Sequence, residues 1–157
     1  MTDSTLATPD AVAAPAPRGP ASVAELAQQL PGFVQGARWF WWIAGFTAIN
    51  AALNLSHSNV NFVVGLAFTL LAHAGLAPGA ALVVDALFVG FFFLAGLHAQ
   101  KGRTWAFALG AAAYAIDALI YMKFADWLPV AIHAFALFYI GKAFMNLQAA
   151  KKAFGLR

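Results

Sequence analysis

AALVVDALFVGFFFLAGL, the stretch at residues 80–97, contains a single charged side chain, Asp85. A helix needs roughly 20 mostly apolar residues to span the hydrocarbon core of a bilayer. This stretch is therefore predicted to be a transmembrane helix, with the acid inside the span.

Four further apolar segments accompany it, and polar or turn-forming residues separate them. They cover residues 38–55, 61–76, 104–122 and 127–145. The predicted fold class is all-α, a polytopic membrane helical bundle of five transmembrane helices within residues 37–146. Residues 61–76 are short for a span, so four spans plus a re-entrant segment at these residues is the alternative.

The composition indicates a lipid environment. Apolar residues make up 62% of the 157 residues and charged residues 10%, whereas about a quarter of the residues in soluble proteins are charged. The nine Lys and Arg residues are scattered, and they flank apolar runs without any nucleic-acid-binding motif. We therefore expect no nucleic acid partner. The absence of cysteine excludes disulfides, thiolate metal sites and cysteine nucleophiles.

The two ends of the chain differ in composition from the predicted helical bundle at residues 37–146. Residues 1–21 are rich in Ala and Pro and are predicted to be a disordered tail. Residues 22–36 are predicted to contain a short interfacial helix, because Ser22 and Glu25 fit a capping box. Residues 147–157 form a basic C-terminal tail.

Five spans would place the two termini on opposite faces of the membrane. The C-terminal face would then carry Lys101, Arg103, Lys151, Lys152 and Arg157, and the N-terminal face would carry Arg18, Arg38 and Lys123. Cytoplasmic loops carry an excess of Lys and Arg. This charge bias predicts a periplasmic N-terminus and a cytoplasmic C-terminus.

Ionisable side chains within the spans are the best functional lead. Each costs at least about 2.5–3.5 kcal/mol on insertion scales, so it needs a compensating role. Asp85, Asp117 and His133 each lie about six residues inside a span, roughly 9 Å below the face that holds the N-terminus in the five-span arrangement. His73 lies somewhat shallower. The shared depth predicts one intramembrane cluster.

Other polar residues extend this cluster along helical faces. Thr69 precedes His73 by four residues, Tyr121 follows Asp117 by four, and Asn50 lies within the first span. The alternative is that each acid only pins two helices together through hydrogen bonds. In that case Asp117→Asn is expected to be nearly silent, since one interhelical hydrogen bond averages about 0.6 kcal/mol in membranes.

Several of these stretches resemble a set of small uncharacterised bacterial multi-pass membrane proteins. The resemblance rests on residues 38–45 (RWFWWIAG) with Asn50, on Asp85, on residues 114–117 (YAID) and on residues 133–137 (HAFAL). It covers residues 37–146. It implies a bacterial inner membrane and brings no activity with it.

Three functions remain open from the sequence. The first is an accessory or assembly subunit of a larger membrane complex, or a homo-oligomer. The second is a proton- or ion-coupled protein that uses Asp85, Asp117 and His133, because histidine titrates near neutral pH. The third is a haem or metal protein with His73 and His133 as axial ligands. Hydrolytic activity is not expected, because the spans contain no serine and no nucleophile-elbow or zinc-protease pattern.

Overall fold

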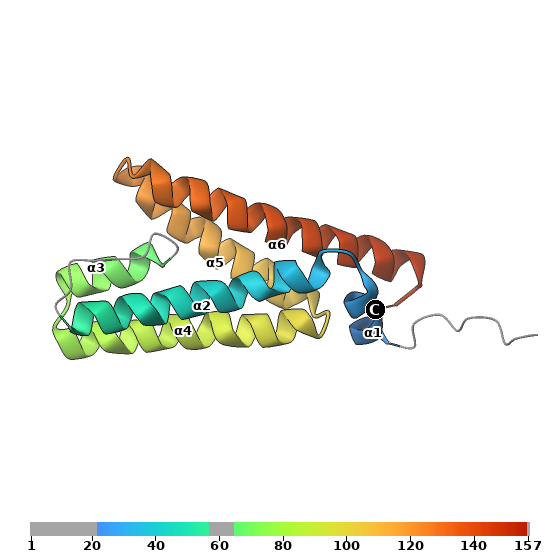
Figure 1. Ribbon diagram of the computed structural model, residues 1–157, viewed down its shortest axis with the longest axis horizontal. Coiled ribbons are helices and arrows are strands. Elements are labelled where there is room, and N and C mark those ends of the chain that lie inside the picture. Colours follow the sequence, from blue (N-terminus) through green and yellow to red (C-terminus); the bar gives the residue numbers. More distant parts are fainter. Residues whose placement is uncertain (1–21, 57–64, 157) are drawn as a thin grey trace, which may run out of the picture.

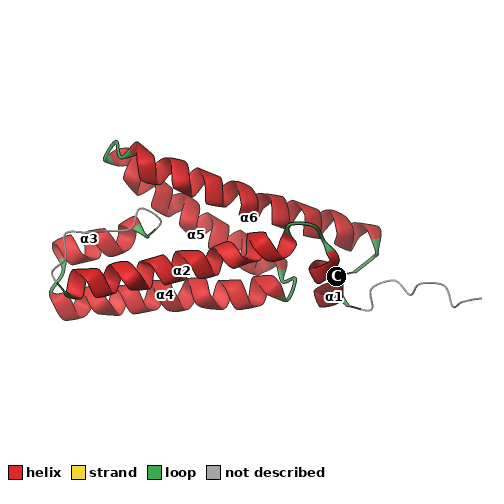
Figure 2. Cartoon of the chain, viewed as in Figure 1, coloured by secondary structure: helices red, strands yellow, loops and turns green. Residues whose placement is uncertain are grey.

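A computed structural model of the chain describes residues 22–56 and 65–156, and these residues form an all-helical bundle. The helices are α1 (Val23–Gln29), α2 (Phe33–Leu55), α3 (Ala67–Gly75), α4 (Pro78–Gln100), α5 (Thr104–Lys123) and α6 (Trp127–Ala153). Figure 2 shows that only short loops connect them within the described ranges. The predicted all-α class is confirmed.

The four long helices form two antiparallel pairs, α2 with α4 and α5 with α6 (Figure 1). The pairs are closest near α1 and diverge toward the other end of the bundle. The short helix α3 lies at that diverging end and packs against α4, α5 and α2. Its position next to three long helices places it at the candidate site.

Three of the helices, α4, α5 and α6, are long and apolar enough to cross a membrane. Only 28–33% of the residues in their most apolar parts are buried by the rest of the chain. Large apolar side chains such as Leu87, Leu119 and Phe138 are more than half exposed. Contiguous exposed apolar surface marks a lipid or protein contact, so the chain is a helical membrane protein.

Helix α2 packs mainly against α4 and α6. Its buried residues recur every three or four positions, from Phe33 through Phe40 to Thr47 and Asn50. Its 23 residues rise about 34 Å, although Arg38 and two asparagines lower its apolar content. It begins five residues before the predicted start of the first span.

Helix α3 departs from the predicted second span at residues 61–76. It is nine residues long, starting at Ala67, and residues 61–64 lie outside the described ranges. Nine residues rise about 14 Å, less than half of the roughly 30 Å hydrocarbon core. Five transmembrane helices are therefore not confirmed. The helix ends at Gly75, because Leu76 is extended and Pro78 starts the next helix.

The two ends of the described chain lie at the same end of the bundle (Figure 1). Helix α1, capped by Ser22 as predicted, packs against α2, α6 and α4. The Asn146 side-chain amide donates to the Pro31 carbonyl oxygen at 3.5 Å. This arrangement differs from the five-span expectation, which put the termini at opposite ends. The physical reason is that α3 is too short to carry the chain back across the bundle.

Candidate functional site

The predicted polar residues do gather at one end of the bundle, and it is the end away from α1. Asn50, Asp117 and His133 are 0% exposed, and Thr69, Asp85 and Tyr121 are also buried, while His73 is half-buried. The sequence had placed this cluster near the face holding the N-terminus. That placement depended on five spans, which are not confirmed, and the cluster lies at the α3 end, where α2 ends, whereas α2 starts beside α1.

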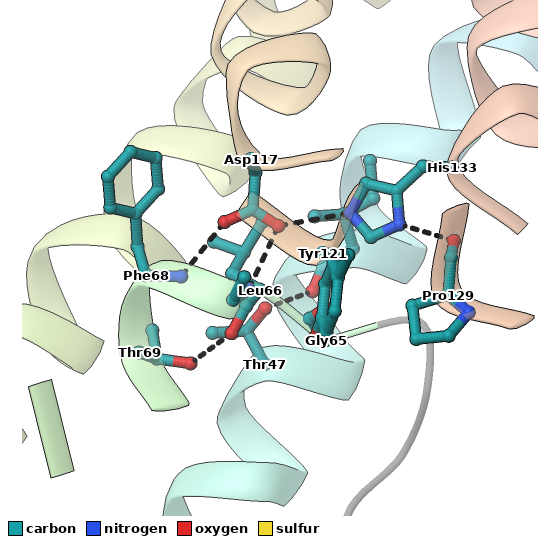
Figure 3. Close-up of polar contacts among 11 residues, drawn as sticks. Thr47, Gly65, Leu66, Phe68, Thr69, Asp117, Tyr121, Pro129 and His133 are labelled. Carbon is teal, nitrogen blue, oxygen red and sulfur yellow. Dashed lines mark hydrogen bonds and ion pairs between the residues drawn. The ribbon is translucent and has the colours of Figure 1, made fainter. Parts of the chain in front are cut away.

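Asp117 joins α5 to the start of α3. Its Oδ2 accepts a hydrogen bond from the Ala67 N–H at 2.9 Å, and its Oδ1 accepts one from the Phe68 N–H, also at 2.9 Å (Figure 3). The first N–H groups of a helix have no partner within the helix, and the positive end of the helix dipole favours an anion. A side chain 50 residues away in the sequence therefore caps α3.

His133 holds the other side of the Asp117 carboxyl. Its Nε2 lies 3.0 Å from Asp117 Oδ2, and its Nδ1 donates to the Pro129 carbonyl oxygen at 2.8 Å. A carbonyl oxygen only accepts, so this contact assigns a proton to Nδ1. The bond between Nε2 and Oδ2 then requires a second proton, on either the imidazole or the carboxyl. Both arrangements give the pair zero net charge, which lowers the cost of burying it.

Two tyrosines enclose the imidazole. The Tyr114 ring stacks on His133 with centroids 4.0 Å apart and planes 16° apart. The Tyr121 ring is tilted against it at 5.3 Å, and its hydroxyl donates to the Gly65 carbonyl oxygen at 3.2 Å. The sequence had not singled out Tyr114. The available signal was its spacing, because residues three apart lie on one helical face and Asp117 follows Tyr114 by three.

A second acid–histidine pair holds the other end of α3. His73, in the last turn of α3, places its Nε2 at 2.7 Å from Asp85 Oδ2 on α4. The Phe68 ring also stacks on Phe88 of α4, with centroids 5.3 Å apart. Within the described ranges, the buried Oδ1 of Asp85 has no hydrogen-bond partner. Helix α3 is thus attached to α5 at its first turn and to α4 at its last turn.

The single predicted cluster therefore consists of two acid–histidine pairs, Asp117 with His133 and Asp85 with His73, and α3 connects them. Ala67 and His73 are six residues apart, which corresponds to about 9 Å along the helix. Thr69 serves a local role, because its hydroxyl donates to the Leu66 carbonyl oxygen at 2.8 Å. Asn50 lies fully buried on α2.

A haem or metal site with His73 and His133 as ligands was the third function left open by the sequence. Among the residues that the structure describes, no three His, Asp or Glu side chains gather as a metal site. Both ring nitrogens of His133 are engaged, so this residue would have to break a bond to become an axial haem ligand.

No protein-family model, curated protein or solved structure matches this chain.

Proposed function

We propose that this protein is an accessory or assembly subunit of a larger membrane complex, or a homo-oligomer, in a bacterial inner membrane. The observation that carries the proposal is the engagement of both carboxyl oxygens of Asp117 within the bundle. Its carboxyl takes three hydrogen-bond partners from its own chain and is 0% exposed. A group engaged in this way is suited to fix helices in place.

The proposed membrane arrangement has four spans, α2, α4, α5 and α6, with α3 as a re-entrant segment. Irregular backbone at membrane depth is tolerated where protein buries it. In many transporters the start of such a half-helix points at an anionic substrate. Here Asp117 supplies the anion at the start of α3. Because a side chain of the same protein fills this position, the geometry supports a structural role over a transport role.

The lateral surface is then the part of the chain available for function. The loops after α4 and α5 contain three residues each, at 101–103 and 124–126. The described ranges therefore include no domain outside the bundle. Much of the outward surface is apolar, and it suits contact with lipid or with other membrane helices.

We predict that both chain ends face the cytoplasm. The end of the bundle near α1 carries Arg38, Lys101, Arg103, Lys151 and Lys152, whereas the end near α3 carries Lys123 beside Asp126. The positive-inside rule therefore assigns the α1 end to the cytoplasm. A reporter that works only in the cytoplasm should be active when fused to either terminus. Activity at the C-terminus alone would contradict the four-span arrangement.

A proton-coupled function is the second candidate. It is favoured by the bond between His133 Nε2 and Asp117 Oδ2, which requires a proton that either partner can carry. Histidine exchanges protons near neutral pH when it is accessible. The complete burial of this pair supports the assembly role over the proton-coupled one.

Native mass and proton flux separate the two candidates. We expect the protein extracted in mild detergent to have the mass of a defined oligomer or complex, and the pure protein in vesicles to conduct no protons. His133→Gln removes the titratable ring. His98→Gln is the matched control, because the His98 ring bonds to the Leu94 carbonyl oxygen of its own helix and packs on Trp105, away from the two acid–histidine pairs. A monomer whose proton flux is lost in folded His133→Gln, but kept in His98→Gln, would overturn the assembly proposal.

A further inference from the structure

Two grooves run along the outer face of α2, at the end of the bundle opposite the acid–histidine pairs. The larger groove has a volume of about 730 Å³. It is lined by residues of α2 and of the connection between α1 and α2, namely Leu30, Gly32, Val34, Gln35, Arg38, Trp39, Trp42 and Phe46. The smaller, of about 490 Å³, is lined by Arg38, Trp41, Trp42 and Gly45. Arg38 and Trp42 belong to both grooves and form a ridge between them.

The grooves are polar at one end and aromatic along their length. Arg38 is exposed, and no carboxylate among the described residues forms an ion pair with it. The first turn of α2 contains no acidic residue. From Arg38 to Phe46 the helix rises about 12 Å, which lies within one leaflet of a bilayer. With the α1 end at the membrane surface, Arg38 and the neighbouring tryptophans lie near the headgroups, and Phe46 lies deeper, toward the acyl chains.

The aromatic walls are held in fixed orientations. Trp39 stacks on Tyr139 at 6.4 Å, and Trp42 stacks on Phe46 at 5.9 Å. Trp41 stacks on Phe93 and donates its Nε1–H to the Phe93 carbonyl oxygen at 3.3 Å. A Cβ added at Gly45 would meet no atom within 4 Å, so the smaller groove is open there.

We propose that this ridge binds an anionic diacyl phospholipid of the cytoplasmic leaflet. The Arg38 guanidinium binds the phosphate, since its planar fork of donors matches phosphate oxygens. The two acyl chains lie along the two grooves, one on each side of Trp42. Tryptophan is enriched at this membrane depth, and the cytoplasmic leaflet is rich in anionic lipid. The site lies at the end of the bundle that the basic residues assign to the cytoplasm.

Tryptophan quenching by brominated lipids tests the proposal on the full chain. Trp105→Phe and Trp127→Phe remove the two tryptophans outside the grooves. In nanodiscs, brominated phosphatidylglycerol should quench the remaining tryptophans at about fivefold lower mole fraction than brominated phosphatidylcholine. This factor corresponds to the attraction between one basic residue near the membrane surface and anionic lipid. Arg38→Gln should abolish this preference, and Arg38→Lys should retain part of it. Equal quenching by the two lipids would overturn the proposal.

Two further variants separate this site from general surface charge. Arg103→Gln removes an exposed basic residue at the same end of the bundle and should leave the preference unchanged. Gly45→Phe fills the smaller groove and should weaken binding of the diacyl lipid but not of single-chain lysophosphatidylglycerol. The proposal fails if Arg103→Gln matches Arg38→Gln, if Gly45→Phe has no effect, or if a second copy of the chain covers the tryptophans.

Discussion

Asp117→Ala is expected to release α3 from the bundle and to destabilise the folded protein by about 3–5 kcal/mol, the range for breaking a buried pair. The change leaves the N–H groups of Ala67 and Phe68 and the Nε2 of His133 without their partner. Each unsatisfied buried group costs about 1–3 kcal/mol. A single interhelical hydrogen bond in a membrane averages only about 0.6 kcal/mol, so the convergence of three bonds on one residue sets the size of the effect.

Thermal unfolding in detergent measures the destabilisation, and a cysteine probe locates it. The chain contains no cysteine, so a single Ala72→Cys reports on α3 without background. Ala72 is 8% exposed and should react with a thiol reagent slowly, and much faster when Asp117 is alanine. Ala74→Cys, at an exposed position on the same helix, should react quickly in both backgrounds. Continued protection of Ala72→Cys would show that Asp117 does not hold α3.

The geometry also changes the expectation for Asp117→Asn. From the sequence, a helix-pinning acid was expected to tolerate this change almost silently. An amide has one accepting oxygen and one donating nitrogen, and the nitrogen must face either the Ala67 or the Phe68 N–H. One buried donor is then left unpaired, so about 1–3 kcal/mol is expected even for a purely structural role.

The long helices were predictable because the bilayer imposes a length on apolar segments. The segment at 104–122 became Thr104–Lys123, and 80–97 became Pro78–Gln100. Helix α3 was not predictable in the same way, because Asp117, 50 residues away in the sequence, caps its start. The predicted five crossings and the opposite placement of the chain ends both depended on that one segment, so neither is confirmed.

The site residues were predictable by depth, but their pairing was not. Counting residues from the helix ends places Asp117 and His133 at one level, and the structure joins them at 3.0 Å. The backbone donors of α3 leave no mark in the sequence, so its attachment to Asp117 could not be foreseen. Its attachment to Asp85 is made by the His73 side chain, which the sequence had placed in the same cluster. Tyr114 shares a helical face with Asp117, but that spacing alone does not separate a site residue from an aromatic residue that packs in an apolar span, so the sequence did not place it in the cluster.

The second large effect is expected at Gly36, where α2 packs tightly against α6. A Cβ at this position would overlap the Ala143 Cβ and lie 2.8 Å from the Tyr139 carbonyl oxygen. Small residues allow such close packing of membrane helices, and the carbonyl cannot move unless α6 moves. Gly36→Ala is therefore expected to separate the helices at a cost near the upper end of overpacking, about 3 kcal/mol.

Gly141→Ala is the matched control for Gly36→Ala, because its Cβ would meet nothing within 4 Å. This control should be neutral or stabilising by about 0.5–1 kcal/mol, since alanine is favoured over glycine within a helix. Adding Ala143→Gly to Gly36→Ala removes one of the two obstructions and should restore only part of the thermal stability, because the Tyr139 carbonyl oxygen remains in place. Equal unfolding temperatures for Gly36→Ala and Gly141→Ala would rule out a tight contact between α2 and α6. Full recovery in the double variant would mean that the carbonyl oxygen does not limit how closely the two helices pack.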